Sequence, residues 1–396
     1  MLRIHHASML ALIFAVQMNV TAAPLAPLAV ASSASASDSA KNIIVTGGKG
    51  NTYYQMASEL QKYVSPGLTV SESDGSWDNL VKLADKPGVT FGIVQSDALM
   101  YFARSVEVEP DLDAKRRYKA YLGRLRVMLP LHEEELHVLV HRLSPMNYIH
   151  EIKGKRIFMG RPNSGAYISG GEVYKTLFGN APPKSDVVAA DSFKQNDSAA
   201  EVREALTNLG KLPQRSVGPD VDVVILVGGQ PFKAIRALEA SPAVAANFKF
   251  LAIDPKHAET PKLLQNYSLA TLEKKNYPTL LDGSKSSDTL AVQAYLVTAG
   301  FKDKDRNEFV DRFAENYCRS YQSVVADTTS HEKWKKVKWK PGQKFPEMVH
   351  GWKAISKSTL NLLTNCKAID PPPPASAPVK KKCKYPSPVP DDCPNG

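Results

Sequence analysis

Cysteine is scarce in this chain and occurs only near its C-terminal end. Four cysteines are present among 396 residues, and no two of them have the CxxC spacing of a structural zinc site. A cysteine-stapled scaffold is therefore excluded. Four cysteines allow three pairings. The pairing that keeps the C-terminal tail independent of the body joins Cys318 to Cys366 and Cys383 to Cys393, and we expect that one.

Long hydrophobic runs are also missing. The most apolar stretch, residues 7–20, is interrupted by Gln17 and Asn19 and falls short of the roughly 20 apolar residues that cross a bilayer. Basic residues before it and small residues after it are typical of a secretory signal, with an uncleaved anchor as the alternative. We expect a signal peptide at 1–22, an Ala/Ser/Pro linker at 23–41 and a mature protein that is periplasmic or secreted.

Charge of one sign is only moderately in excess over the whole chain. Lys and Arg number 50 against 40 Asp and Glu, and the net charge of +10 suits attraction of anions without indicating nucleic acid. Trp334 and Trp339 alternate with lysines in the segment 334–340. We interpret this segment as a solvated face anchored by two tryptophans rather than as a nucleic-acid or membrane contact. We expect no nucleic-acid partner.

Recognisable catalytic, cofactor and metal motifs are absent. The G-x-S-x-G elbow of hydrolases does not occur. Gly48 begins a dinucleotide-like fingerprint, but Tyr53 occupies its third glycine position. His132 and His137 are five residues apart and cannot share a helical face as the histidines of H-E-x-x-H do. We therefore predict no enzyme, cofactor or metal site. An exported enzyme that uses His137 or Asp97 is the alternative.

The hydrophobic pattern alternates between strand and helix. Apolar runs at 43–46, 89–94 and 221–227 predict strands, and each is followed by a Gly- or Ser-rich turn and by helical spacing. This alternation predicts an α/β protein with a mostly parallel sheet. A strand at 289–297 and a helix at 348–363 predict that the chain returns to its first unit, leaving a cleft between two lobes. We expect lobe 1 at 42–140 and 286–366, lobe 2 at 141–285 and a Pro/Lys-rich tail at 367–396.

Six segments occur in the order found in one receptor family. They are TGGKGNTYY at 46–54, GSWDNL at 75–80, GIVQSD at 92–97, IKGKR and PNSG within 152–165, GGQP at 228–231 and the strand at 289–298. Together they resemble the TAXI subfamily, the extracytoplasmic solute receptors of tripartite ATP-independent periplasmic (TRAP) transporters. The resemblance implies a two-lobed, type II periplasmic-binding-protein fold that closes on a small organic anion. Glutamate, glutamine and oxo-acids are the usual solutes.

The resemblance also implies where the ligand binds and what the protein does. Turns that open helices offer backbone N–H groups and positive helix ends to an anion, and Tyr53 would add an apolar wall with a polar tip. The implied function is a non-enzymatic receptor that delivers its solute to a TRAP-type permease. A receptor-like envelope interaction or sensing protein that acts through the C-terminal tail is the alternative. The candidate ligand-binding residues are Gly48, Asn51, Tyr53, Ser76, Gln95, Asn163, Ser164, Gly165 and Gln230.

Overall fold

One mixed β-sheet organises the fold. The computed structural model describes residues 42–193, 198–210, 220–283, 286–346 and 352–366. The strands are β1 (Ile43–Val45), β2 (Thr69–Ser71), β3 (Val89–Gln95), β4 (Leu125–His141), β5 (Ile157–Phe158), β6 (Val223–Gly228), β7 (Phe248–Phe250), β8 (Ser268–Glu273) and β9 (Ser286–Ala299). Within the described residues their order is β2-β1-β3-β9-β4-β6-β5, with β7 beside β4 and β8 beside β9.

The two longest strands, β4 and β9, pair with each other in the middle of the sheet. Gly92 of β3 lies opposite Val297 of β9, and Glu135 of β4 lies opposite Gly228 of β6. Among the described strands, β1–β2, β1–β3 and β5–β6 are parallel, and the other five pairings are antiparallel. The expectation of a mostly parallel sheet is therefore wrong, because β4 and β9 run against every strand with which they pair.

Helices cover both faces of the sheet. They are α1 (Thr52–Tyr63), α2 (Ser76–Asp85), α3 (Ser96–Glu107), α4 (Leu112–Arg124), α5 (Gly165–Phe178), α6 (Ser198–Gly210), α7 (Lys233–Glu239), α8 (Pro242–Ala245), α9 (Thr260–Leu263), α10 (Lys304–Ala326) and α11 (Lys357–Thr364). Successive side chains of a strand point to opposite faces. Ile44 accordingly belongs to the core under α1 and α10, whereas Ile43 and Val45 belong to the core under α2, α3 and α4.

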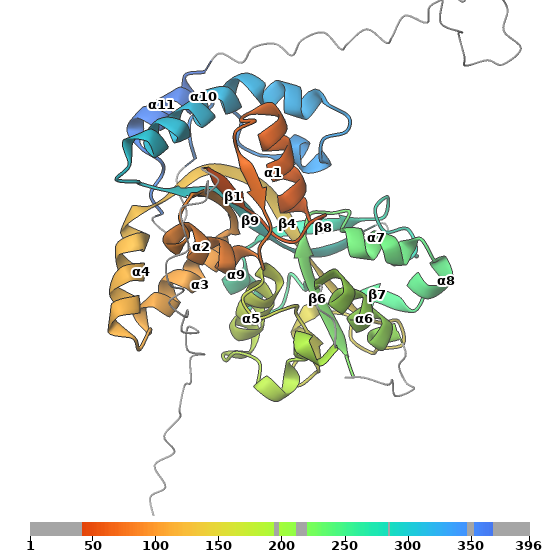
Figure 1. Ribbon diagram of the computed structural model, residues 1–396. Helices are drawn as coiled ribbons and strands as arrows, with labels where there is room; N and C mark the ends of the chain where they lie inside the picture. Colours follow the sequence, from red (N-terminus) through yellow and green to blue (C-terminus); the bar gives the residue numbers. More distant parts are fainter. Residues whose placement is uncertain (1–41, 194–197, 211–219, 284–285, 347–351, 367–396) are drawn as a thin grey trace, which may run out of the picture.

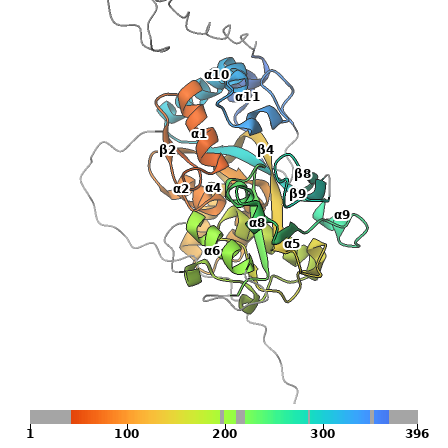
Figure 2. The same ribbon diagram turned by 90° about the vertical axis from the view of Figure 1, so that its right-hand side faces the viewer.

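The helices divide the molecule into two lobes. Figures 1 and 2 show α1, α10 and α11 at one end and α5 and α6 at the other. We call β1–β3 with α1–α4, α10 and α11 the first lobe, and β5–β7 with α5–α8 the second lobe; β4 and β9 contribute to both. The predicted two-lobed α/β arrangement is confirmed, and the lobe boundaries stay predictions. In the described part of the chain, no helix is long and apolar enough to cross a membrane.

A disulfide ties the C-terminal end of the described chain to the first lobe. It joins Cys318 of α10 to Cys366, which follows α11 and lies 48 positions later in the sequence. This pairing agrees with the sequence-based expectation. The second expected pair, Cys383 with Cys393, lies outside the described residues, as do the signal peptide and linker at 1–41 and the tail at 367–396.

The last helix is shorter than the sequence pattern indicated. A helix was expected over 348–363, but α11 begins at Lys357 and residues 352–356 are not helical. Ser356 sets the start, because its Oγ accepts a hydrogen bond from the backbone N–H of Thr359 at 3.2 Å. A side chain that satisfies this N–H is the usual signal of a helix N-terminus.

The tryptophan- and lysine-rich segment 334–340 forms a solvated face. Trp334 and Trp339 are buried in the core of the first lobe. Its four lysines, at positions 335, 336, 338 and 340, are exposed. The prediction of an exposed face anchored by two tryptophans is therefore confirmed. Lys333, directly before the segment, differs from these lysines because it is fully buried.

A bulge interrupts the pairing of β4 with β9 at the junction of the lobes. Pro130 pairs with Tyr295 and Glu133 with Gln293, so three steps along β4 match two along β9. Pro130 has no backbone N–H for the ladder, which favours a bulge at this place. The side-chain amide of Gln293 donates hydrogen bonds to the carbonyls of Leu131 at 3.1 Å and His132 at 3.2 Å. Gln293 thus satisfies carbonyls that the interrupted ladder leaves without a strand partner.

Gln293→Leu tests this role. Leucine has a similar volume but no amide donor, so we expect the free energy of unfolding to fall by about 1–3 kcal/mol, the usual effect of leaving buried polar groups unpaired. Urea denaturation followed by circular dichroism would measure it. Gln265→Leu is the matched control, because Gln265 is exposed and its side chain has no hydrogen bond within the described residues. Equal losses in both variants would contradict the role given to Gln293.

Candidate functional site

A cavity of about 570 Å³ lies between the two lobes. The first lobe contributes the turn before α1, the turn before α2 and the end of β3. The second lobe contributes the turn before α5, part of α6, the end of β6 and the start of α7. Glu134 of β4 and His331, which precedes the C-terminal tryptophans, complete the lining. Segments that are far apart in the sequence therefore meet at one place.

Seven of the nine sequence-predicted ligand residues line this cavity. They are Gly48, Asn51, Tyr53, Ser76, Gln95, Ser164 and Gly165. Asn163 does not line it: this residue is exposed and has a left-handed backbone, with φ of 68°. The structure thus brings together turns that are far apart in the sequence. Whether these residues bind a ligand stays a prediction.

Gln230, the ninth predicted residue, does not face the cavity. Its side-chain amide donates to Glu135 Oε1 at 3.2 Å and to the carbonyl of Thr271 at 2.8 Å. Its Oε1 accepts hydrogen bonds from the backbone of Glu273 and from Asn276, both at 3.0 Å. The amide is therefore used within the second lobe, where it joins the end of β6 to β8. The prediction that Gln230 faces the cleft is therefore wrong, because these contacts hold its side chain away from the cavity.

Four helices begin at the cavity. The residues before α1, α2 and α7, which are Asn51, Gly75 and Phe232, make no side-chain capping bond. Only the start of α5 is capped, by Ser164, whose Oγ accepts from the N–H of Tyr167 at 3.2 Å. Uncapped N–H groups and the positive ends of helix dipoles favour an anion. The cavity is therefore suited to a negatively charged group.

Glycines allow the lobes to approach each other at this place. A Cβ atom on Gly165 would lie 2.1 Å from Oε1 of Gln95, so a larger residue at the start of α5 would have to displace the end of the Gln95 side chain. Gly50 has φ of 92°, and a Cβ atom there would lie 2.8 Å from Nζ of Lys233. Lys233 of the second lobe thus reaches the turn before α1. Lys233 was not among the predicted residues, because nothing in the local sequence distinguishes it from other exposed lysines.

The charged side chains around the cavity are positive on balance. Arg161 is neutralised, since it forms a two-pronged ion pair with Glu201 at 2.8–3.0 Å and lies 3.7 Å from Asp74 across the lobe boundary. Lys49, Lys233 and Arg236 also line the cavity, and within the described residues their side chains have no ion-pair partner. These three are the groups that remain available to attract an anion.

The innermost part of the cavity contains a buried acid and a tyrosine. The Tyr53 hydroxyl donates a hydrogen bond of 2.6 Å to Oε2 of Glu134. Burial and the nearby Glu134 carboxylate raise the pKa of Tyr53 well above its ordinary value, so Tyr53 keeps its proton. Glu134 was not among the predicted residues. The available signal was its place in the polar run 132–135, which interrupts an otherwise apolar strand.

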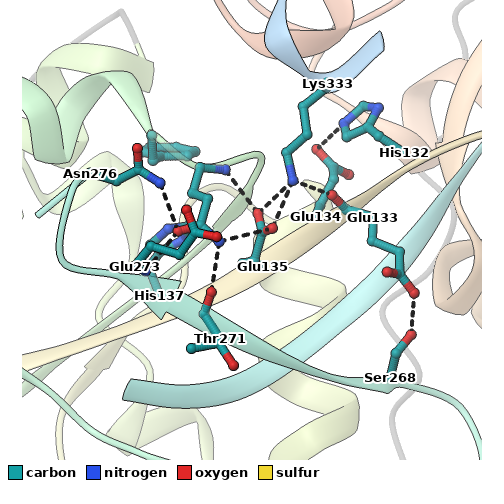
Figure 3. Close-up of polar contacts among 12 residues, drawn as sticks. His132, Glu133, Glu134, Glu135, His137, Ser268, Thr271, Glu273, Asn276 and Lys333 are labelled. Atoms are coloured by element: carbon teal, nitrogen blue, oxygen red, sulfur yellow. Dashed lines mark hydrogen bonds and ion pairs between the residues drawn. The ribbon is translucent and has the colours of Figure 1, made fainter. Parts of the chain in front are cut away.

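Behind the cavity wall, Lys333 and Glu135 form a buried ion pair. Nζ of Lys333 lies 2.7 and 2.8 Å from the two carboxylate oxygens of Glu135 and donates to the carbonyl of Glu133 at 2.7 Å, as Figure 3 shows. Burial of the carboxyl opposes ionisation, yet the Lys333 ammonium lowers the pKa of Glu135. Burial in turn lowers the pKa of Lys333. The pair connects the C-terminal segment to the end of β6, because Lys333 also packs against Gly229.

Lys333→Met tests the importance of this pair. The variant leaves the carboxylate of Glu135 buried without a counter-charge, so we expect the free energy of unfolding to fall by about 3–5 kcal/mol. Adding Glu135→Gln should recover a large part of the loss, because the uncompensated charge is removed. Lys336→Met, at an exposed position nearby, should change little. Urea denaturation of all variants provides the measurement, and a loss that Glu135→Gln does not reduce would overturn the explanation.

The two residues named for the alternative of an exported enzyme, His137 and Asp97, do not line the cavity. His137 is fully buried in the second lobe, where its Nε2 is 2.8 Å from the hydroxyl of Tyr277, and burial lowers its pKa to about 4. Asp97 lies at the start of α3 and accepts hydrogen bonds from Ser169 of α5 at 2.6 Å and from Tyr267 at 2.9 Å. Asp97 therefore connects the first lobe to the second.

Among the described residues, no group of three or more His, Cys, Asp or Glu is placed to hold a metal ion.

Asp97 makes stability depend on pH. Burial raises its pKa from 3.8 to about 6, so between these values the folded protein holds a proton that the unfolded chain has released. The free energy of unfolding should therefore fall as pH rises from 4 to 6, by up to about 3 kcal/mol from this group. Asp97→Asn should flatten that part of the profile, and Asp113→Asn, at an exposed carboxylate, should not. Denaturation at several pH values would measure the slopes, and an unchanged slope in Asp97→Asn would contradict the assignment.

The mixed sheet, the helices on both of its faces and the cavity between the lobes define a two-lobed α/β fold. A family model described as the NMT1-like family matches residues 44–317, which is well over half of the chain. The chain belongs to the NMT1-like family.

Solved structures with a similar fold have low sequence identity to this chain. The arginine-, lysine-, histidine-binding protein ArtJ from Geobacillus stearothermophilus is 15% identical, with 75% of this chain and 94% of that chain covered and a TM-score of 0.37. The alkanesulfonate-binding protein SsuA from Xanthomonas axonopodis pv. citri, bound to MOPS, is also 15% identical, with 73% of this chain and 75% of that chain covered and a TM-score of 0.36. XAC2383 from Xanthomonas citri, bound to ATP, is 11% identical, with 85% of this chain and 92% of that chain covered and a TM-score of 0.40. The likeness is one of fold alone.

Proposed function

We propose that the protein is an exported solute receptor of the TAXI type, which binds a small organic anion between its lobes and delivers it to a TRAP-type permease. One observation carries the binding function: a cavity at which four helices begin and at which Lys49, Lys233 and Arg236 line the wall without an ion-pair partner in the described residues. Positive helix ends and free cations together favour a carboxylate. Membership of the NMT1-like family supports a receptor rather than an enzyme.

The size of the cavity supports a ligand of amino-acid or oxo-acid size. Its volume of about 570 Å³ lies within the range of sites that bind small molecules. A molecule with one or two carboxylates would place one of them at the uncapped helix starts and beside Lys233. Glutamate, glutamine and 2-oxoglutarate are therefore the first solutes to test.

The location and the partner rest on the sequence. The apolar stretch at 7–20 and the small residues after it support export, and the family supports an extracytoplasmic receptor. Delivery to a TRAP-type permease rests on the TAXI-like segments, which supply all nine candidate ligand residues, and seven of these nine line the cavity. Capture of a solute outside the membrane and its release to a permease require no covalent chemistry, in accordance with the absence of recognised catalytic motifs.

A thermal-shift panel of carboxylates tests the proposal. The protein is first unfolded and refolded to remove any solute carried through purification. A ligand present at about 100 times its dissociation constant should stabilise the folded state by about 2.7 kcal/mol and raise the melting temperature by several degrees. Lys233→Ala should weaken binding about 10- to 100-fold, as expected for loss of a hydrogen bond to a charged group. Lys302→Ala, at an exposed position outside the cavity, is the control.

Two outcomes would count against the proposal in different ways. If no carboxylate shifts the melting temperature of the refolded protein, the receptor function for organic anions is rejected. If a carboxylate binds but Lys233→Ala and Lys302→Ala respond equally, the receptor function stands and the assigned anion site is rejected.

A further inference from the structure

One acidic side chain in the cavity does not fit a site that recognises anions alone. Glu134 lines the cavity although only 4% of its surface is exposed. Its Oε2 accepts the hydrogen bond from Tyr53, and within the described residues no group donates a hydrogen bond to its Oε1. The nearest basic atom to Oε1 is Nε2 of His132, at 3.8 Å, which is beyond hydrogen-bond distance. A carboxylate placed here repels an anionic ligand group and attracts a cationic one.

The unused acceptor capacity of Glu134 identifies the kind of group that would bind it. An ionised carboxylate has about four acceptor sites, and the described protein groups fill one of them. Buried polar atoms in proteins are nearly always hydrogen-bonded. An ammonium group supplies three N–H donors and a positive charge, whereas the carbonyl of an oxo-acid supplies only acceptors. The innermost part of the cavity is therefore matched to an amine.

The neighbouring glutamates show that this arrangement is particular to Glu134. Glu135 is neutralised by Lys333, and Glu133 by Lys338 at 2.7 Å and by a hydrogen bond from Ser268. Figure 3 shows these two acids directed to Lys333 and Ser268. Among the three consecutive glutamates, Glu134 alone lines the cavity and has no ion-pair partner other than the distant His132 within the described residues.

We propose that Glu134 makes the cavity selective for α-amino acids over the corresponding oxo-acids, by binding the ligand's ammonium group while Lys233 and the helix starts bind its carboxylate. The inference rests on the proposed function and specifies its ligand class. The cavity wall carries both charges, because exposed Lys233 lies against the turn at Gly50 and buried Glu134 is hydrogen-bonded to Tyr53. A zwitterion with adjacent ammonium and carboxylate groups complements both charges.

Matched ligand pairs that differ only in the amino or oxo group test the proposal. Isothermal titration calorimetry on refolded protein would compare glutamate with 2-oxoglutarate and alanine with pyruvate. In at least one pair we expect the amino acid to bind 10-fold or more tightly than its oxo-acid. Glu134→Gln retains the size of the side chain and an acceptor for Tyr53 but loses the negative charge. We expect this variant to lose at least a factor of 10 in the preference for the amino acid.

Glu133→Gln is the matched control, because it makes the same change at the preceding residue of β4, whose carboxylate is directed away from the cavity. It should leave the preference unchanged. If both members of each pair bind equally to the unaltered protein, or if the oxo-acids bind more tightly, the role of Glu134 is overturned while the receptor function stands. Binding of no carboxylate at all would reject the receptor function as well. Should Glu134→Gln not fold, as judged by circular dichroism, the comparison in the unaltered protein still decides.

Discussion

The pairing of β4 with β9 is the constraint on which the rest of the structure depends. Both strands contribute to each lobe, so neither lobe has a sheet that is complete without the other. Their ladder slips only between Val127 and Leu129 and between Pro130 and Glu133. A bulge bends a strand and redirects the side chains that follow it. Glu134 comes directly after the second irregularity, which explains how a residue of a central strand faces a cavity between lobes.

Three consecutive glutamates on β4 have three different environments, and this difference determines which negative charge faces the cavity. Glu135 is paired with Lys333 from a segment near the end of the chain, and Glu133 contacts Lys338 from the same segment. Both charges are therefore compensated outside the cavity. Within the described part of the chain, Glu134 accepts a hydrogen bond only from the hydroxyl of Tyr53, and it remains open to a ligand. The buried carboxylate of Glu134 and the exposed cations of the cavity wall together produce an electric field that runs from the cations to the carboxylate. Such a field suits a ligand that carries both a negative and a positive group.

Contacts between the lobes are short and of several kinds. The start of α5 touches Gln95 at Gly165, Lys233 approaches Gly50, and Arg104 of α3 forms an ion pair of 2.6 Å with Glu172 of α5. Asp97 adds a buried hydrogen-bonded connection from α3 to Ser169. Because both lobes line the cavity, a ligand bound there would be enclosed by both of them. Enclosure removes water and strengthens each charged interaction that the ligand makes.

The sequence by itself determined the features that depend on neighbouring residues. The strand, turn and helix pattern indicated the α/β class, and the turns at 46–54, 75–80 and 162–165 indicated six of the candidate ligand residues that line the cavity. Hydrophobic periodicity and glycine-rich turns are local signals, so they are readable without a structure. The pairing of Cys318 with Cys366 followed from the expectation that the tail, with its own two cysteines, is independent of the body.

Only the tertiary structure decided which distant side chains meet. Tyr53 and Glu134 are 81 residues apart, and Glu135 and Lys333 are 198 apart, so no local pattern links them. The same reason accounts for Gln230, whose turn motif indicated a ligand contact but whose amide is consumed by Glu135 and β8. Strand direction was also beyond the sequence, because hydrophobic patterning shows which face of a strand is buried but not which strand lies beside it.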